Sequence, residues 1–523
     1  MRVQRSLPAW WSRYMFAGHR GGWLSEKTGL LALLLLGVVI RVSHAAQGPM
    51  WRDEAQLLNV VSLPSAAAIR DFLIAHESHP PLFYLLMRWW LQVAPPGELM
   101  SIAPGIVLGS ATVLLTWWLG RLVAGPRAGG VAALLVTLSP RLIESATVAR
   151  PYSTLTFVLL AAVALMWRAV STGSRVALAG WAGASVALLY LHNWSALPVA
   201  ATGLSALWLV VSRRSPLQAG PLILAGVAVF LGWLPWVPNV IHQAQHGGQL
   251  PPATSPLIRA PLHMVSSVPG LSIEAGVVLL AGVLGLALLR RSDWALSDDA
   301  RSWLRLTTAI VLLTVALAAV GSFRTDLLVP HVLPVLAPMV LIIVAILLTA
   351  DSSRGKLLAV ATLCLVLGLS LHDAFGMARS PRSNADRVAQ RVAREATEED
   401  LVVLLPADLV SSFERHFSGR APLFGYPEGE DNRPFEYNDR LAREADPDVL
   451  AAAAMRLERT ITSGGRIWEV SAGVERHLKA PWMETGARLR AMGATVVVVP
   501  VDSSRRTATL EDIRLRVWRR LGR

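Results

Sequence analysis

The 523-residue sequence is poor in cysteine and in charge. Its single cysteine, Cys364, lies in an apolar run, which excludes an intrachain disulfide and a metal site built from cysteine thiolates. Charged residues make up 16% of the chain, against roughly 25% in an ordinary soluble domain. We see no internal repeat, no glycine-rich phosphate loop and no basic patch with interleaved aromatic residues, so we expect no cofactor and no nucleic acid partner.

Apolar residues are abundant instead. They form 53% of the chain, and the mean hydropathy is +0.46. Apolar runs of about 20 residues, the length that crosses a hydrocarbon core, recur between Gly29 and Asp373. The sequence therefore predicts a polytopic α-helical membrane protein in the plasma (inner) membrane.

The basic residues predict how the chain is threaded. Residues 81–94 are about 14 in number and carry Arg88, which favours an interfacial helix over a span. On that assumption 17 of the 25 Lys and Arg residues before residue 375 lie in the cytoplasm, whereas a span at 81–94 leaves only 9 there. We therefore expect 11 spans, with the amino terminus inside and the carboxyl terminus outside. They fall near 28–45, 100–120, 128–147, 152–168, 176–192, 195–212, 217–238, 271–289, 304–322, 328–349 and 357–373.

The chain divides into three parts. Residues 1–27 form a basic cytoplasmic leader, and 28–374 form the membrane domain, with juxtamembrane helices at about 55–94. From about residue 375 the composition becomes that of a soluble domain, so 375–523 is predicted to be an extracytoplasmic domain.

This last domain has an α/β pattern with a mainly parallel sheet, because short apolar runs alternate with helical patterns. Its basic tail, 510–521, is predicted to be a docked amphipathic helix. The predicted strands are 401–405, 466–470 and 494–499, and the predicted helices are 385–396, 448–461 and 474–492.

The predicted topology gathers polar residues on the outer face. Asp53 and Glu54 directly follow the first span, where an acidic pair is costly unless it faces water or a partner. The pair can equally be an ordinary solvated loop pair. His79 opens the motif His-Pro-Pro nearby, and Arg150 and Tyr152 flank the second outer loop. We see no comparable set on the cytoplasmic face, so the outer face is the predicted working face.

The outer surface has no nucleotide pool, so a synthetic reaction there needs a pre-activated donor such as a lipid-linked phosphosugar. Such a transfer needs a carboxylate base, here Asp53, and groups that stabilise the leaving phosphate. Candidates for the phosphate are His79, Arg150, Arg259 and Arg324. Each has a plainer explanation, such as a loop end for His79 or an arginine that reaches to the interface for Arg150.

Three histidines form a separate candidate site for a divalent ion. His242, His246 and His263 all fall in the outer stretch 239–270. Their spacing matches no tight metal motif, so we do not assign a metal.

Several of these motifs together resemble the GT-C membrane glycosyltransferases, particularly the dolichyl-phosphate-mannose-protein mannosyltransferases and bacterial aminoarabinose transferases. The matching pieces are Trp51-Arg52-Asp53-Glu54, His79-Pro80-Pro81-Leu82-Phe83-Tyr84, Ala149-Arg150-Pro151-Tyr152 and the Pro330–Pro338 segment. The resemblance implies an inverting transfer from a polyprenyl-phosphate sugar to an extracytoplasmic glycolipid, glycan or protein acceptor.

The resemblance also implies roles for individual residues. Asp53 matches the catalytic acidic position, and Asp53 and its neighbour Glu54 are the catalytic candidates. His79 matches a position near the donor phosphate. His331 stands where the family usually has Tyr and Pro330 where it has Arg, so Arg324 is a candidate substitute. The resulting substrate-binding candidates are Tyr84, Tyr152, His192 and His331. Glu144 is the one candidate we find for a second acidic residue, and no obligatory metal is implied.

Two other functions compete with this one. A transporter or flippase of lipid-linked sugars should have charges near mid-membrane and symmetric halves, neither of which stands out. A non-catalytic assembly or sensing protein would not need the acidic pair together with His-Pro-Pro, although a degenerate relative would keep both.

Overall fold

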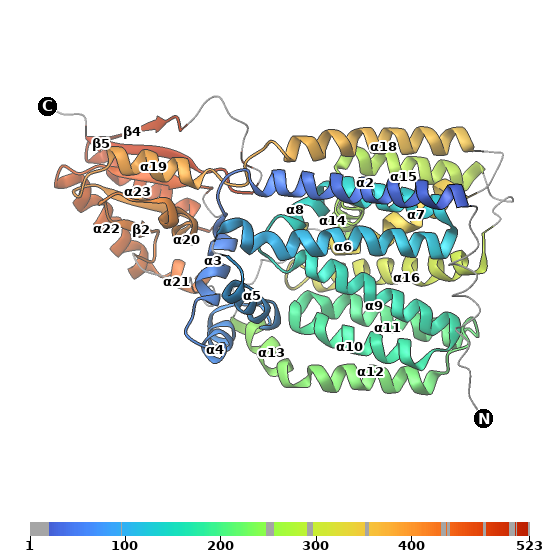
Figure 1. Ribbon diagram of the computed structural model, residues 1–523. Coiled ribbons are helices and arrows are strands. Elements are labelled where there is room, and N and C mark those ends of the chain that lie inside the picture. The colour runs from blue at the N-terminus through green and yellow to red at the C-terminus, as the bar shows by residue number, and fades with distance from the viewer. Residues whose placement is uncertain are drawn as a thin grey trace.

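The computed structural model describes residues 20–95, 97–246, 256–289, 296–350, 355–429, 436, 440–473, 477–501, 508 and 510–520. A long helical bundle has an α/β domain at one end, and the first described helix, α2, begins at the other (Figure 1). Most of the predicted leader, residues 1–19, lies outside the described residues.

The helical bundle confirms a multi-pass membrane protein. In the described residues, seven helical segments are long and apolar enough to cross a membrane, and four shorter apolar helices take the positions of the other predicted spans. The bundle helices are α2 (Arg20–Ala45), α6 (Glu98–Ala124), α7 (Pro126–Leu138), α9 (Tyr152–Thr172), α10 (Arg175–Leu191), α11 (Ala196–Val211), α12 (Ala219–Trp233), α15 (Ile273–Leu289), α16 (Asp298–Gly321), α17 (Ala337–Thr349) and α18 (Lys356–Met377).

Small residues bring neighbouring bundle helices close together. Helix α6 ends at Gly125, whose φ of +90° suits glycine, and Pro126 begins α7 at once. A Cβ on Gly129 of α7 would lie 2.7 Å from the carbonyl oxygen of Trp117 in α6. Glycine is therefore required where these two helices cross, as is common between helices in lipid.

Three short helices lie at the end of the bundle that faces the α/β domain: α3 (Arg52–Val61), α4 (Ala66–His76) and α5 (Leu82–Val93) (Figure 1). Helix α5 buries Phe83, Tyr84 and Met87, whereas Trp89 is exposed. The interfacial position of residues 81–94 stays a prediction. Three further short helices are α8 (Pro140–Ala146), α13 (Val237–His246) and α14 (Pro256–Ser266), of which α8 and α14 pack against bundle helices.

The C-terminal domain is a five-stranded sheet in the order β2-β1-β3-β5-β4. Strand β1 is buried along its whole length, with α19 on the side of Val402 and α22 on the side of Val403. The elements are α19 (Ala385–Glu395), β1 (Leu401–Leu405), α20 (Val410–Phe413), β2 (Leu423–Gly425), α21 (Arg440–Glu444), α22 (Pro447–Thr462), β3 (Ile467–Ser471), α23 (Lys479–Ala491), β4 (Ala494–Val499) and β5 (Arg514–Arg520).

Two sequence predictions for this domain were wrong. The basic tail is strand β5 rather than a helix, and β5 is antiparallel to both β3 and β4, so the sheet is mixed. Leu515 and Val517 are buried between exposed arginines, which is the period-two alternation of a strand. Hydrogen bonds to a neighbour on each side then override the helical interpretation of the same residues.

The linker from α18 into the α/β domain contacts the loop that follows α2. His44 donates a hydrogen bond from Nδ1 to the carbonyl of Met377 (2.8 Å), and the Arg382 amide donates to the carbonyl of Gln47 (2.8 Å). Gly48 has a φ of +77°, and a Cβ there would lie 2.5 Å from the Ser383 carbonyl. The loop that follows α2 and the start of the C-terminal domain are thus in direct contact.

Candidate functional site

The acidic pair lies in the first turn of α3. Negative side chains are favourable at the amino end of a helix, where amide groups lack partners. Glu54 uses this position, because its Oε2 accepts a hydrogen bond from the Trp51 amide (3.3 Å). Asp53 is half-buried, and within the described residues its carboxylate has no hydrogen bond and no ion pair. Asp53 is thus the member of the pair that is available to a substrate.

Glu54 is fully buried and fully engaged. Its carboxylate pairs with Nη1 of Arg382 at 2.7 Å, with side-chain exposures of 0% and 1%. Its Oε1 accepts a hydrogen bond from the amide of Ala149 (2.8 Å), which directly precedes Arg150. Glu54 therefore joins α3, the loop that carries Arg150 and the linker to the α/β domain.

The surroundings of Asp53 control its proton affinity. Burial raises the pKa of the Asp53 carboxyl above its usual value, while the positive charges of Arg150 and Arg52 act in the opposite direction. A carboxylate with a raised pKa binds a proton more readily, which is what a general base requires.

The His79 ring lies between the side chains of Glu77 and Arg150. Its Nδ1 is 3.2 Å from Oε2 of Glu77, and its Nε2 is 3.2 Å from Nη2 of Arg150. A guanidinium only donates, so Nε2 is the acceptor and Nδ1 carries the proton that bonds to Glu77. The chain Glu77–His79–Arg150 fixes the arginine beside Asp53.

Aromatic rings lie around His79 and Arg150. Together with Asp53 they form a cluster of side chains: Asp53, His79, Tyr84, Arg150, Tyr152, His192 and His331. The His79 ring centre lies 5.3 Å from that of His192 and 6.3 Å from that of Tyr84. The Tyr152 ring lies 5.3 Å from His331 and 6.4 Å from His192. Enclosure by protein, aided by the charge of Arg150, lowers the pKa of His331 to about 4, so this ring is neutral near pH 7.

Two donors in the cluster are unused. Within the described residues, the buried Nε of Arg150 and the buried hydroxyl of Tyr84 have no hydrogen-bond partner. Buried polar atoms are nearly always paired, so unpaired ones call for an explanation. A cation and a hydroxyl left in this state suit an anionic ligand such as a phosphate.

A cavity of about 160 Å³ adjoins the cluster, between the bundle and the α/β domain. Tyr152 and His331 line it, and Leu510 lines it from the C-terminal domain. Glu144, the candidate second acid, also lines it but pairs with Arg141 at 2.9 Å.

Two predicted phosphate ligands lie apart from this cluster. Arg259 pairs with Asp326 at 2.6 Å, and Arg324 is exposed. In the described part of the chain neither has a hydrogen bond or ion pair with a residue of the cluster. Their role at a donor phosphate stays a prediction.

The candidate histidine site for a divalent ion is incompletely described. His263 lies 3.4 Å from Arg259, and the side chain of His246 is outside the described residues. Among the residues that the structure describes, no group of three or more His, Cys, Asp or Glu side chains could hold a metal ion.

Sequence reasoning missed Glu77, Arg382 and Gln243. Gln243 is buried in α13 and donates to the Leu73 carbonyl (3.0 Å), while Asn193 donates to its side-chain oxygen (3.0 Å). These contacts join distant segments, so no local spacing could indicate them. Glu77 was within reach, because it lies two residues before His79.

Comparison with known proteins identifies the fold. No protein-family model and no curated protein sequence matches the chain. Among solved structures, ArnT from Cupriavidus metallidurans in the apo state is 15% identical, with a TM-score of 0.55 over 95% of this chain and 98% of that chain. The same protein bound to undecaprenyl phosphate matches with 15% identity, the same coverage and a TM-score of 0.52.

A weaker match is the oligosaccharyltransferase AglB from Archaeoglobus fulgidus, in complex with an inhibitory peptide and a dolichol-phosphate. It is 11% identical, covers 85% of this chain and 69% of that chain, and has a TM-score of 0.46, too low to support a shared fold by itself. The likeness to ArnT confirms the predicted GT-C-like fold, and the sheet confirms a C-terminal α/β domain.

Proposed function

We propose that the protein is a glycosyltransferase that moves a sugar from a polyprenyl-phosphate donor to an acceptor at the extracytoplasmic face of the membrane. The observation that carries this proposal is the unpaired Asp53 carboxylate beside Arg150, whose Nε and whose neighbour Tyr84 are unpaired donors. It is supported by the fold shared with a protein solved with undecaprenyl phosphate.

In the proposed reaction Asp53 accepts the proton of an acceptor hydroxyl as that oxygen attacks the anomeric carbon. The bond between this carbon and the phosphate oxygen breaks, and polyprenyl phosphate leaves with both bonding electrons. Arg150 and the Tyr84 hydroxyl stabilise the charge on the leaving phosphate. A single displacement from the opposite side inverts the anomeric configuration.

The other residues bind or position. His79 holds Arg150, while Tyr152, His192 and His331 form a wall of rings that suits a sugar. Glu54 has no oxygen left for chemistry, so its proposed role is to hold Asp53 and Arg150 in place.

The proposed test uses purified protein in lipid vesicles, a panel of polyprenyl-phosphate sugars and mixed glycolipid acceptors, with mass spectrometry of products. We expect one donor to yield polyprenyl phosphate and a sugar-bearing acceptor, and Asp53→Asn to yield neither. Because the proposed phosphate ligands are protein donors, EDTA should not slow the transfer. Movement of an intact donor across the bilayer without release of polyprenyl phosphate would instead support a transporter.

A further inference from the structure

The C-terminal domain binds both residues that flank Asp53. The Arg52 amide donates to Oε1 of Glu511 (3.2 Å), and its guanidinium pairs with Asp408 at 3.4 Å. On the other side of Asp53, Glu54 pairs with Arg382 at 2.7 Å. The first turn of α3 is therefore held at two successive points by residues that follow the last membrane helix.

Arg382 contacts three separate segments of the chain. Its Nη1 also donates to the carbonyl of Thr147 (3.3 Å), at the start of the loop that carries Arg150. Its own carbonyl accepts hydrogen bonds from the amides of Leu510 (3.0 Å) and Glu511 (3.1 Å). One buried arginine thus joins α3, the 147–150 loop and the segment that precedes β5.

Glu511 is equally enclosed, with an exposure of 2%. Its Oε2 accepts hydrogen bonds from the hydroxyls of Ser383 (2.8 Å) and Ser412 (3.1 Å), while Oε1 accepts from the Arg52 amide. A buried carboxylate with three donors has one favourable orientation, because any rotation leaves a polar group without a partner.

We propose that Arg382 and Glu511 are positioning residues for the transfer reaction, so that the α/β domain forms part of the catalytic apparatus. They hold the proposed base Asp53 and the phosphate ligand Arg150 at a fixed separation. This inference rests on the proposed function. Misplacing reacting groups by about 1 Å can cost roughly 100-fold in rate.

The test measures kcat and KM of the full-length protein in lipid for Arg382→Met, Arg382→Lys and Glu511→Gln. A matched control is Arg466→Met, which breaks the 2.8 Å pair with Asp400 inside the same domain and touches neither α3 nor the 147–150 loop. We expect Arg382→Met to lower kcat about 100-fold, with the acceptor KM within threefold of wild type.

Arg382→Lys should recover about tenfold of that loss, because it keeps the charge opposite Glu54 but not the fork of donors. Glu511→Gln should lower kcat about tenfold while the melting temperature stays near that of wild type, which separates positioning from unfolding. Arg466→Met should leave kcat within threefold.

Wild-type kcat in both Arg382→Met and Glu511→Gln would overturn the inference while leaving the glycosyltransferase intact. Equal losses in Arg466→Met would overturn it too, since they would show only damage to the domain. An inactive wild type across the donor panel would overturn the proposed function and this inference together.

Discussion

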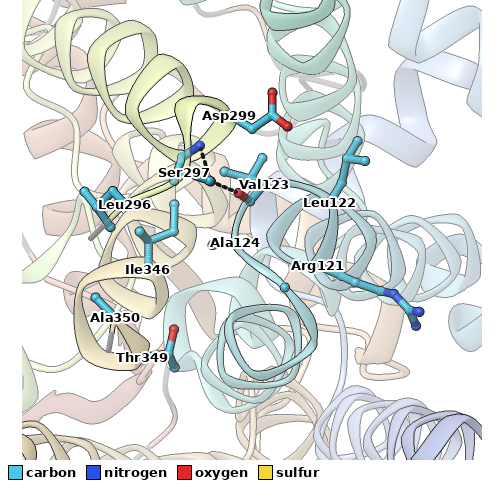
Figure 2. A pocket seen from close by; sticks show the side chains of 12 residues that line it. Arg121, Leu122, Val123, Ala124, Leu296, Ser297, Asp299, Ile346, Thr349 and Ala350 are labelled. Atoms are coloured by element: carbon cyan, nitrogen blue, oxygen red, sulfur yellow. Dashed lines mark hydrogen bonds between the residues drawn. The ribbon is translucent and has the colours of Figure 1, made fainter. Parts of the chain in front are cut away.

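The two ends of the helical bundle differ in how their polar groups are used. The end away from the α/β domain has the larger cavity, about 360 Å³, where α6 and α17 end and α16 begins (Figure 2). Ser297 there donates to the carbonyl of Val123 (3.1 Å) and caps the Ala300 amide (3.1 Å), and nearby Arg121 pairs with Glu26. The two Ser297 contacts satisfy backbone groups at helix ends, and Arg121 has an ion-pair partner.

The end that faces the α/β domain has the smaller cavity but leaves Asp53, Arg150 Nε and the Tyr84 hydroxyl without direct partners in the described residues. Cavity size therefore does not indicate the site. The unpaired carboxylate of Asp53 near the unpaired donors of Arg150 and Tyr84 does, because leaving buried donors unpaired is costly unless a ligand completes the arrangement.

The largest effect is expected when the proposed base is removed. Asp53→Asn keeps the shape of the side chain but cannot accept a proton, so we expect transfer to fall about 10²- to 10⁴-fold. The measurement is product formation at saturating donor, with the melting temperature as a control for folding. Transfer at the wild-type rate would remove Asp53 from the mechanism.

Arg150 should come next. Arg150→Gln removes a donor to the phosphate, so we expect a loss of about 10²- to 10³-fold. It also removes a charge that lowers the pKa of Asp53, so the pH below which transfer is lost should rise. Rate profiles from pH 4 to pH 9, about the range that surrounds a shifted carboxyl, would show this, with Arg150→Lys as the charge-keeping control. If Arg150→Gln loses transfer at the same low pH as the wild type, Arg150 does not act on the Asp53 carboxyl as proposed.

Glu54 distinguishes chemistry from positioning. Glu54→Gln leaves the buried Arg382 without its counter-ion, which should lower the free energy of unfolding by about 3–5 kcal/mol. At temperatures where the variant is still folded, we expect transfer to fall only about tenfold, less than for Asp53→Asn. Thermal unfolding and transfer rates measured on the same preparation test both points. A loss as large as that of Asp53→Asn would mean that Glu54 takes part in the chemistry.

The smallest effect is expected at the opposite end of the bundle. Ser297→Ala removes a helix cap, which should lower stability by about 1 kcal/mol. Transfer should stay close to the wild-type rate, since this residue lines the larger cavity and not the one beside the proposed site. A marked loss of transfer would show that both ends of the bundle take part in the reaction.

Hydropathy and charge were enough to predict the membrane domain, because spans are local in sequence and must be apolar. The same topology placed Asp53, His79 and Arg150 on one face, and the structure brings them together. It did not indicate Arg382 or Glu511. Arg382 lies 328 residues from its partner Glu54, in a linker with no motif.

Strand β5 shows a second limit. Arginines around Leu515 and Val517 fit either a basic helix or an exposed strand, and only the gap between β3 and β4 decides between them. Pairing partners that far apart are not encoded in any local period.

The residues that contact α3 are far from it in the sequence, which has a consequence for how the protein is made. Arg52 and Glu54 follow the first bundle helix and are synthesised early, yet the residues that bind them are made 459 and 328 positions later. A nascent chain therefore inserts its first helices with this turn still unanchored. A chain that stops before Glu511 lacks the contact between this residue and Arg52, so we expect it to be inactive in the proposed transfer.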